Sequence, residues 1–250
     1  MRACYLQDDY PFSYFNSQGD LVGLDVDMTH ILARELGLKL EFIPLEQGLN
    51  EKAEIAAYLN GNSCDILIPS LALTPQATEV VKFTHSFSKR TVALVVKDHK
   101  KEKFSNWKEL QKSQNLRLAI PCNVPYYIAK FKGLLPNAEV IVTKRNIRDL
   151  LVADSNEFDA LIWPAENASA WTILYPSNVV AVPQPIVSIP VGYMLPKNAD
   201  SLAEVVNVWL DLKEEDGTIK SLYDYWVQGK IQSVTKPRWS IIRNVLGWVK

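Results

Sequence analysis

The fold class is decided by residues 25–42, which read DVDMTHILARELGLKLEF. Four apolar residues recur at the spacing of one helical face and predict a helix over residues 25–36: Met28, Ile31, Leu32 and Leu36. Asp25 is expected to cap the start of this helix, and Gly37 supplies the left-handed residue that ends it. Residues 38–42 then alternate apolar and charged side chains, which predicts a half-buried strand.

The same alternation of strand and helix continues on both sides of this stretch. The predicted elements are a strand at 3–6, the helix at 25–36, strand 38–42, helix 51–60, strand 65–69, strand 117–120, helix 126–131, strand 139–142, helix 147–152, strand 160–162, strand 191–195 and helices 203–212 and 219–227. The charged stretch at 97–103, KDHKKEK, is expected to be a surface loop between two runs of this pattern. Two βαβαβ runs predict two α/β lobes. We expect strands 3–6 and 65–69 in one sheet and strands 117–120 and 160–162 in another.

Composition and charge exclude several classes of protein. The chain has 250 residues, of which 48% are hydrophobic, and its 27 basic residues nearly balance 28 acidic ones. A nucleic-acid binder needs a basic face that releases counterions, so we expect no nucleic-acid partner. The sequence contains no apolar run of about 18 residues, the length that a membrane-spanning helix needs.

The three cysteines and three histidines do not have the spacing of a metal site. Cys4, Cys64 and Cys122 are scattered along the chain, and we expect them to be small buried hydrophobic residues. We therefore predict no metal and no cofactor.

Three spaced blocks of sequence carry a resemblance to a known family. Residues 10–28 read YPFSYFNSQGDLVGLDVDM, residues 64–88 contain CDILI, LTP, VKFT and FS, and residues 216–226 contain DGT and YDYW. In this order the blocks resemble the family 3 extracellular solute-binding proteins, over roughly residues 2–230 of this chain.

The resemblance implies a two-lobed type II periplasmic-binding-protein fold, in which each lobe is a βαβ-rich mixed sheet flanked by helices. The first lobe would comprise residues 1–90 and 189–250, and the second lobe would be the inserted residues 91–188. Such a module closes its cleft on a small polar or anionic solute, amino-acid-like or a carboxylate, for transport. The implied partner is a membrane transporter component of the ABC type. The implied location is periplasmic or extracytoplasmic, with a signal or fused membrane part outside this chain.

The sequence departs from the family at the two positions that bind the carboxylate and the ammonium group of an amino-acid ligand. The arginine that clamps the ligand carboxylate follows a threonine by three residues, and here Thr74 is followed by Ala77. Ser70 and Ala72 occupy the neighbouring glycine and hydroxyl positions. The acidic residue that takes the ligand ammonium falls at or near Pro164. Because a buried charge without a partner costs several kcal/mol, the usual α-amino-acid site is expected to be lost.

Substitutes for these residues lie close to the lost positions. Glu166 is two residues past the lost acid, at a predicted helix start, and is either a ligand-binding acid or only a helix-terminal one. Arg90, at the first crossover, is either a replacement clamp or a surface arginine in an ion pair. Asn123 could contact an anion at a helix start or simply cap that helix. The predicted ligand-binding residues are Tyr10, Tyr14, Ser70, Thr74, Arg90, Asn123, Trp163 and Glu166.

Two other functions remain open on the same fold. One is a non-catalytic sensor or regulatory domain of a transporter or receptor, which the missing clamp residues favour. The other is a dehydratase-type enzyme, for which Glu166 and His85 are the imaginable acid and base. The sequence shows no nucleophile elbow or phosphate loop. We therefore predict a binding protein that is not an enzyme. Asp25 and Asp27 are interpreted as capping and structural residues.

The C-terminal segment, residues 237–250, is explained least by the resemblance. After Asp224 the sequence has no acidic residue, whereas it has five basic ones. An apolar stripe at helical spacing comprises Trp239, Ile242, Val245, Leu246 and Val249. Two interpretations remain open, a helix packed on the first lobe or a helix that docks on an anionic membrane surface or a partner. Similar tails follow binding-protein-like domains fused to dicarboxylate-type symporters.

Overall fold

A computed structural model describes residues 1–45, 52–61, 63–121, 124–152 and 157–230. The strands are β1 (Arg2–Tyr5), β2 (Tyr14–Phe15), β3 (Leu21–Val22), β4 (Glu41–Pro44), β5 (Ile66–Ala72), β6 (Val81–Phe83), β7 (Ser88–Lys97), β8 (Arg117–Ile120), β9 (Glu139–Val142), β10 (Ala160–Pro164), β11 (Asn178–Ala181) and β12 (Ser188–Pro196). The α-helices are α1 (Leu24–Glu35), α2 (Lys52–Asn60), α3 (Trp107–Lys112), α4 (Pro125–Leu134), α5 (Ile147–Val152), α6 (Ala165–Leu174), α7 (Asp200–Glu215) and α8 (Thr218–Trp226). Short 3₁₀ helices cover Ala77–Glu79 and Asp98–Phe104.

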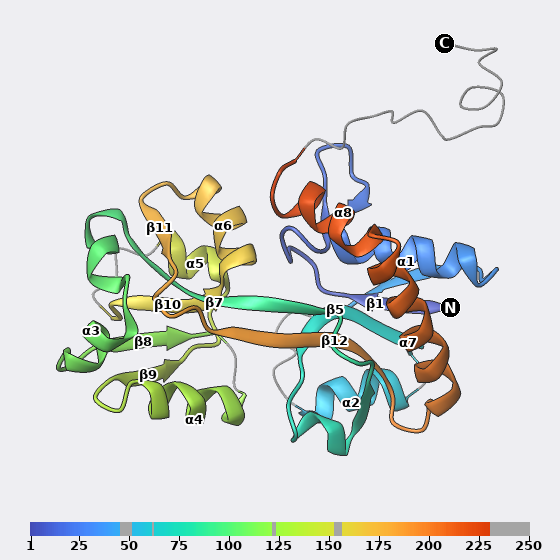
Figure 1. Cartoon of the computed structure of the whole chain (residues 1–250), viewed down its shortest axis with the longest axis horizontal. Helices are drawn as coiled ribbons and strands as arrows, with labels where there is room; N and C mark the ends of the chain where they lie inside the picture. Colours follow the sequence, from blue (N-terminus) through green and yellow to red (C-terminus); the bar gives the residue numbers. More distant parts are fainter. Residues whose placement is uncertain (46–51, 62, 122–123, 153–156, 231–250) are drawn as a thin grey trace, which may run out of the picture.

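Two long strands, β7 and β12, run side by side between two halves of the molecule (Figure 1). We call the part around β1, β4, β5 and β6, with α1, α2, α7 and α8, the first half, and the part around β8 to β11, with α3 to α6, the second half. The strand order is β4-β1-β5-β12-β7-β10-β8-β9, with β6 on β12 and β11 on β7. The prediction of two separate sheets was wrong. β12 pairs with strands of the first half, β7 pairs with strands of the second half, and β7 and β12 pair with each other, so the halves are joined in one hydrogen-bonded series.

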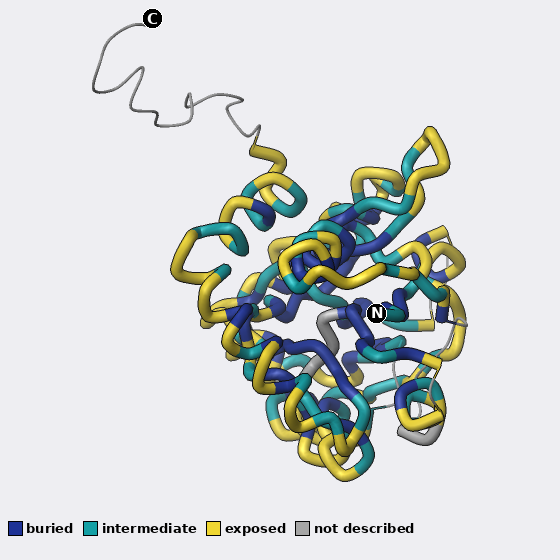
Figure 2. The backbone as a smooth tube through the Cα atoms, turned by 90° about the vertical axis from the view of Figure 1, so that its right-hand side faces the viewer, coloured by how far each residue is buried: buried dark blue, intermediate teal, exposed yellow. Residues whose placement is uncertain are grey.

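Strand alternation builds a core on both faces of the sheet in each half. In the first half, Ala3 and Tyr5 pack with α1, α7 and α8, whereas Cys4 between them packs with α2 and β6. In the second half, Leu118 and Ile120 face α3 and α4, whereas Ala119 faces α5 and α6. The helices therefore flank a mixed sheet on both sides, as the fold class predicts. Figure 2 shows the buried positions along the inner strands and the exposed ones at loops and outer helix turns.

The start of α1 differs from the sequence prediction in a way that matters for the site. Gly23, not Asp25, is the residue before the first turn, and it has φ +135°. A Cβ at Gly23 would lie 2.3 Å from the carbonyl oxygen of Phe12, so glycine allows the loop before α1 to pack this closely. The prediction that Asp25 caps the helix was wrong, since Asp25 lies inside the first turn and is fully buried.

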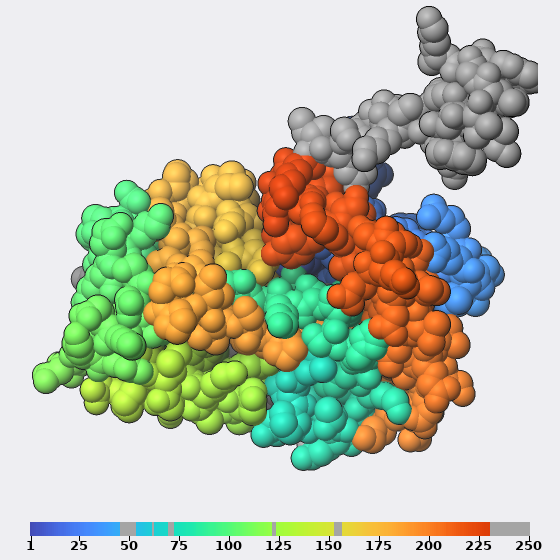
Figure 3. Space-filling view, in the orientation of Figure 1, coloured from blue at the N-terminus to red at the C-terminus, as the bar shows by residue number. Residues whose placement is uncertain are grey.

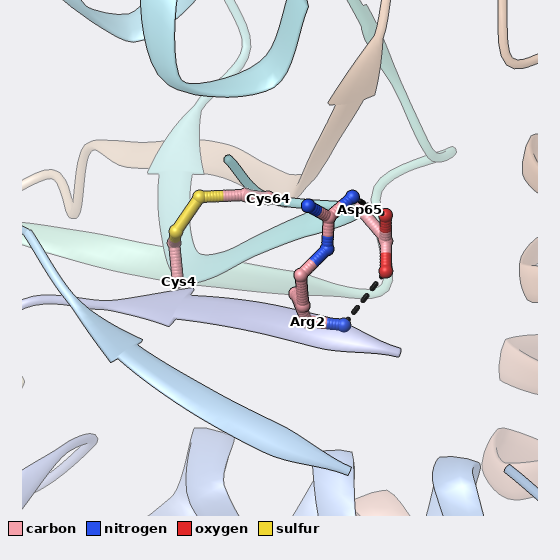
Figure 4. Close-up of a disulfide and its surroundings, with 4 residues drawn as sticks. All are labelled: Arg2, Cys4, Cys64 and Asp65. Atoms are coloured by element: carbon pink, nitrogen blue, oxygen red, sulfur yellow. Dashed lines mark hydrogen bonds and ion pairs between the residues drawn. A yellow bond between two sulfur atoms is a disulfide. The ribbon is translucent and has the colours of Figure 1, made fainter. Parts of the chain in front are cut away.

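Cys4 and Cys64 form a disulfide between β1 and the residues that lead into β5 (Figure 4). The prediction that the cysteines are merely buried hydrophobic residues was wrong for this pair. It was missed because 60 residues separate the two cysteines in sequence, whereas β1 and β5 are adjacent parallel strands. An ion pair between Arg2 Nη2 and Asp65 Oδ1, at 2.7 Å, joins the same two segments.

For several other elements, the predicted first and last residues can be compared with those in the structure. The predicted elements at 117–120, 139–142 and 147–152 coincide with β8, β9 and α5. The strand predicted at 38–42 instead begins at Glu41, after the turn that ends α1. The stretch predicted as a loop at 97–103 largely forms the 3₁₀ helix Asp98–Phe104, whose Phe104 is buried. The segment 237–250 lies outside the described residues.

Candidate functional site

Side chains from both halves meet beside β7. Asn167, in the first turns of α6, donates from Nδ2 to Asp9 Oδ1 at 2.8 Å and to the Tyr10 carbonyl at 2.7 Å. Asp9 and Tyr10 belong to the loop that follows β1, so these bonds tie the first half to the second. Asn167 is 5% exposed, whereas Asp9 and Tyr10 are partly exposed, so the contact is part-buried. The loop after β1 and the start of α6, which directly follows β10, therefore meet, as expected for segments at the C-terminal ends of such strands.

Glu166 makes a second connection between the halves. It lies in the first turn of α6, where the helix dipole favours a carboxylate. Its two oxygens accept from the Thr91 N–H of β7 at 3.2 Å, and Oε1 also accepts from the Tyr223 hydroxyl of α8 at 3.3 Å. Burial and the neighbouring Glu166 carboxylate raise the pKa of Tyr223 to about 12, so the phenol remains a donor at neutral pH.

Arg90 is buried in β7 and is not the surface arginine that was one of the two interpretations. Its side chain is 8% exposed, and its Cζ lies 3.1 Å from the centre of the Phe12 ring. Its Nη2 is 3.9 Å from Oδ2 of Asp25, which is fully buried. The Tyr193 hydroxyl approaches the other oxygen of Asp25 at 3.5 Å. Arg90 is therefore held by a ring face and a buried carboxylate.

The carboxyl group of Asp9 is affected by this packing. Burial raises its pKa to about 6, although the Arg90 guanidinium and the Asn167 hydrogen bond both act in the opposite direction. When the pKa of a carboxyl group stays raised beside a cation, the loss of hydration destabilises the ionised form more than the cation and the hydrogen bonds stabilise it. The Asp9 carboxylate is therefore poorly hydrated where it lies at the junction between the halves.

Aromatic side chains form one wall of the junction. Tyr10 and Tyr14 stack with their ring centres 4.5 Å apart, and Tyr10 also meets Trp171 of α6 edge to face at 5.4 Å. Tyr14 contacts Trp226 of α8, whose Nε1 donates to Asp27 Oδ2 at 2.7 Å. Phe12, between the two tyrosines, is instead a core residue. Tyr10 and Tyr14, both among the predicted ligand-binding residues, are thus placed together.

Four other residues were predicted to bind the ligand, and they differ in how the structure places them. Thr74 is buried and its Oγ1 accepts from the Ala77 N–H, so it stabilises its own turn. Ser70 lies in β5 through its backbone, and Asn123 lies outside the described residues. Trp163 packs in the same cluster as Tyr10, and its buried Nε1 has no hydrogen-bond partner among the described residues.

Three further expectations concern the acid–base pair, a metal site and a membrane-spanning helix. His85 lies 3.3 Å from Asp211 of α7 through its Nε2, so it is not paired with Glu166. Among the described residues, no group of three acidic, histidine or cysteine side chains is arranged to hold a metal ion. Within the same residues, no helix combines the length and the apolar character needed to span a bilayer.

Sequence reasoning missed four residues of this arrangement: Asp9, Asp25, Asn167 and Tyr223. A usable signal existed for two of them, because Asp9 lies in the loop that follows β1 and Asn167 lies in the first turn of α6, directly after the C-terminal end of β10. Tyr223 lies in the C-terminal block, and nothing local to that block indicates that its hydroxyl reaches Glu166. Asp25 was assigned a capping role, but α1 begins one residue earlier, at Leu24, and its N-cap is Gly23.

The raised pKa of Asp9 predicts a specific pH dependence. A carboxyl with pKa 3.8 when unfolded and about 6 when folded contributes stability that is complete below about pH 4 and is lost as pH rises through about 6. Between about pH 4.5 and about pH 7.5, wild-type protein should lose roughly 2 kcal/mol more than Asp9→Asn. Urea unfolding at both pH values measures this difference. Asp8→Asn, which alters the exposed neighbour, should behave like wild type; equal pH dependence in Asp9→Asn would contradict the assignment.

An α/β chain with two halves joined by paired long strands, and with polar side chains meeting at the junction, has the architecture of a type II periplasmic binding protein. The model of the family "Bacterial extracellular solute-binding proteins, family 3" matches residues 1–229. This chain belongs to the family 3 bacterial extracellular solute-binding proteins.

Several known proteins are similar to the chain. An ancestral cationic amino acid solute-binding protein has 27% sequence identity and a TM-score of 0.67, covering 90% of this chain and 94% of that one. A binding component of an ABC transporter from Wolinella succinogenes, complexed with lysine, has 20% identity and a TM-score of 0.74, covering 91% and 95%. Cyclohexadienyl dehydratase of Pseudomonas aeruginosa is 21% identical over 229 residues, which are 91% of this chain and 82% of that protein.

Proposed function

We propose that this domain binds a small solute at the junction of its two halves and delivers it to a membrane transporter. The observation that carries the proposal is the pair of contacts across the junction, from Asn167 to Asp9 and from Tyr223 to Glu166. Two halves joined by a hinge can open and close around a ligand when a few hinge residues absorb the change in backbone torsion. We further propose residues 1–90 with 189–250 as one lobe and residues 91–188 as the other, with the hinge where β7 and β12 pair.

The charge at the junction favours a solute that carries a positive group. Among the side chains that the structure describes, the buried charged ones are Asp25, Glu166 and Arg90, and half-buried Asp9 adds a third carboxylate. These three carboxylates lie at the junction with one guanidinium, and burial alone keeps the pKa of Asp9 raised. An ammonium or guanidinium group on the solute would offset the excess of carboxylates. This disfavours the anionic solute among the sequence expectations, and the similar ancestral protein is named for cationic amino acids.

The proposed residues take different roles in this site. Arg90 and Glu166 set the charge, and Tyr10 and Tyr14 supply an aromatic wall for a cation or an apolar stem. The unpartnered Nε1 of Trp163 supplies a donor for an oxygen of the solute. Ser70, Thr74 and Asn123 remain candidates from the sequence, with Thr74 acting through its turn.

Export from the cytoplasm is supported by the disulfide. Disulfides persist in oxidising compartments and are rare in the reducing cytosol, so the Cys4–Cys64 bond favours a periplasmic or extracytoplasmic site of action. The family description points the same way. We propose a membrane transporter as the partner because the chain belongs to a family of solute-binding proteins. A sensor domain that takes no part in transport is the alternative.

An enzymatic role is the weaker proposal. Similarity to cyclohexadienyl dehydratase is its main support. Acid–base catalysis needs a group held within reach of the reacting atom with a suitable pKa. His85, the imagined base, is paired with Asp211 instead. We therefore propose a binding protein that is not an enzyme.

A thermal-stability panel tests the proposal. Cationic amino acids, diamines, neutral amino acids, dicarboxylates and aromatic acids are added to the full chain while the unfolding midpoint is followed. A ligand of the folded state raises the midpoint in proportion to RT ln(1 + [L]/Kd), so cationic solutes should raise it and dicarboxylates should not. Turnover of a cyclohexadienyl acid into product would support the enzyme instead, and no shift with any solute would favour the sensor.

A further inference from the structure

Helix α7 exposes an apolar stripe that no described residue covers. Val205, Val208 and Leu212 are 46%, 60% and 54% exposed, and their spacing places them on one side of the helix. The opposite side, with Val206, Trp209 and Leu210, is buried in the core of the first half. Figure 3 shows α7 on an open face of the molecule. Exposed apolar residues gathered in this way mark a contact surface more often than scattered ones do.

The charges around this stripe are strongly acidic. Five carboxylates and one lysine lie on α7: Asp200, Glu204, Asp211, Glu214, Glu215 and Lys213. Glu204 and Glu215 have no ion pair among the described residues and lie beside the stripe at helical spacing. A partner for this surface therefore needs an apolar stripe of its own with basic residues around it.

The C-terminal segment of the same chain has this chemistry. Its apolar stripe comprises Trp239, Ile242, Val245, Leu246 and Val249, and its basic residues are Lys236, Arg238, Arg243 and Lys250, with no acidic residue. The match to the family ends at residue 229, so the segment is an addition to the shared domain. Its charge and its apolar pattern both complement those of α7.

The chain leaves the described part of the molecule close to α7. Gln228 and Lys230 line a surface hollow of about 470 Å³ together with Glu214, which lies in the last turn of α7. The eight residues 231–238 can span up to roughly 26–29 Å. From Leu212 back to Val205 the stripe extends about 10 Å along the helix. The apolar residues that begin at Trp239 can therefore reach the whole stripe.

We propose that residues 237–250 pack as an amphipathic helix on the exposed stripe of α7, formed by Val205, Val208 and Leu212, and so cap this face of the domain. The contact would bury apolar residues of both segments and place the basic tail beside the acids of α7. This inference is independent of what the junction binds. It selects one of the two interpretations of the tail that the sequence left open.

Thiol reactivity tests the proposal. Val208→Cys is made in a Cys122→Ser background, both in the full chain and in a chain that ends at residue 236. In the full chain, Cys at 208 should react with a maleimide about tenfold more slowly, as expected if the tail covers the stripe about nine-tenths of the time. Val142→Cys, on β9 of the second half and 41% exposed in the wild type, is the matched control and should react equally in both chains.

A second variant guards against an indirect effect of truncation. Ile242→Asp in the full chain should restore the fast reaction at position 208, because a charge would enter the apolar contact. Equal rates in the full and shortened chains would overturn the proposal. Protection that disappears on strong dilution would assign the stripe to a second copy of the chain. Protection that arises only when anionic phospholipid vesicles are added would assign the tail to a membrane surface, and both results would also overturn it.

Discussion

Replacing Cys4 and Cys64 together by alanine is expected to lower the free energy of unfolding by about 4 kcal/mol. The disulfide closes a loop between residues that are 60 apart in sequence, and it restricts the unfolded chain more than a short loop would. Both cysteines are buried at 0% and 1% exposure, so the substitution also removes packing under α2. For a chain of this size the loss corresponds to a melting temperature lower by roughly 8–16 °C.

Calorimetric or optical melting of wild-type and variant protein measures this loss. A thiol reductant should lower the midpoint of the wild type to nearly that of the double variant and leave the variant unchanged. Cys122→Ala is the matched control, because it removes the third cysteine and leaves the pair intact. A wild-type midpoint that is indifferent to reduction under unfolding conditions would show that the bond does not stabilise the fold.

Replacing Arg90 by methionine is expected to cost roughly 3–5 kcal/mol of stability, because it leaves the buried Asp25 carboxylate without its nearby cation. Methionine retains most of the aliphatic volume, so the loss reports charge more than packing. It also removes the guanidinium from the face of Phe12, at 3.1 Å from the ring centre. Arg90→Lys should recover part of the loss, since lysine keeps the charge but not the planar group that stacks on the ring.

Urea unfolding of four variants tests this account of Arg90. Arg90→Met combined with Asp25→Asn should be more stable than Arg90→Met alone, because the uncompensated carboxylate has been removed. Lys89→Met, which alters the exposed neighbour in β7, should stay within about 0.5 kcal/mol of wild type. If Arg90→Met is as stable as Lys89→Met, the guanidinium does not neutralise the junction.

The limits of a helix or strand could be predicted from the sequence where its apolar pattern is flanked by polar residues. β8, β9 and α5 have the predicted limits because apolar periodicity and flanking polar residues agree there. The long strand β7 was not predicted, β12 was predicted only at residues 191–195, and the pairing of these two strands decides how the halves connect. Pairing between residues 88–91 and 188–191 is a contact about a hundred positions apart, which local periodicity does not carry.

Only part of the candidate site could be predicted, because its contacts also join residues that are far apart in sequence. Arg90 and Glu166 were selected from their places in the chain, and both are buried at the junction. Their partners were not selected, because Asn167 meets Asp9 across 158 residues and Tyr223 meets Glu166 across 57. The disulfide was missed likewise, since its cysteines become neighbours only when β1 and β5 pair.

Isothermal titration of the full chain with a cationic amino acid, with a dicarboxylate as the comparison, tests the central claim most directly. The claim predicts saturable one-site binding of the cationic solute, weakened about tenfold or more in Asn167→Ala, which loses a part-buried hydrogen bond between the halves. Asn60→Ala, at an exposed asparagine that also bonds backbone groups, should bind like wild type. Tighter binding of the dicarboxylate, or cation binding that Asn167→Ala leaves unchanged, would contradict a cation site at this junction.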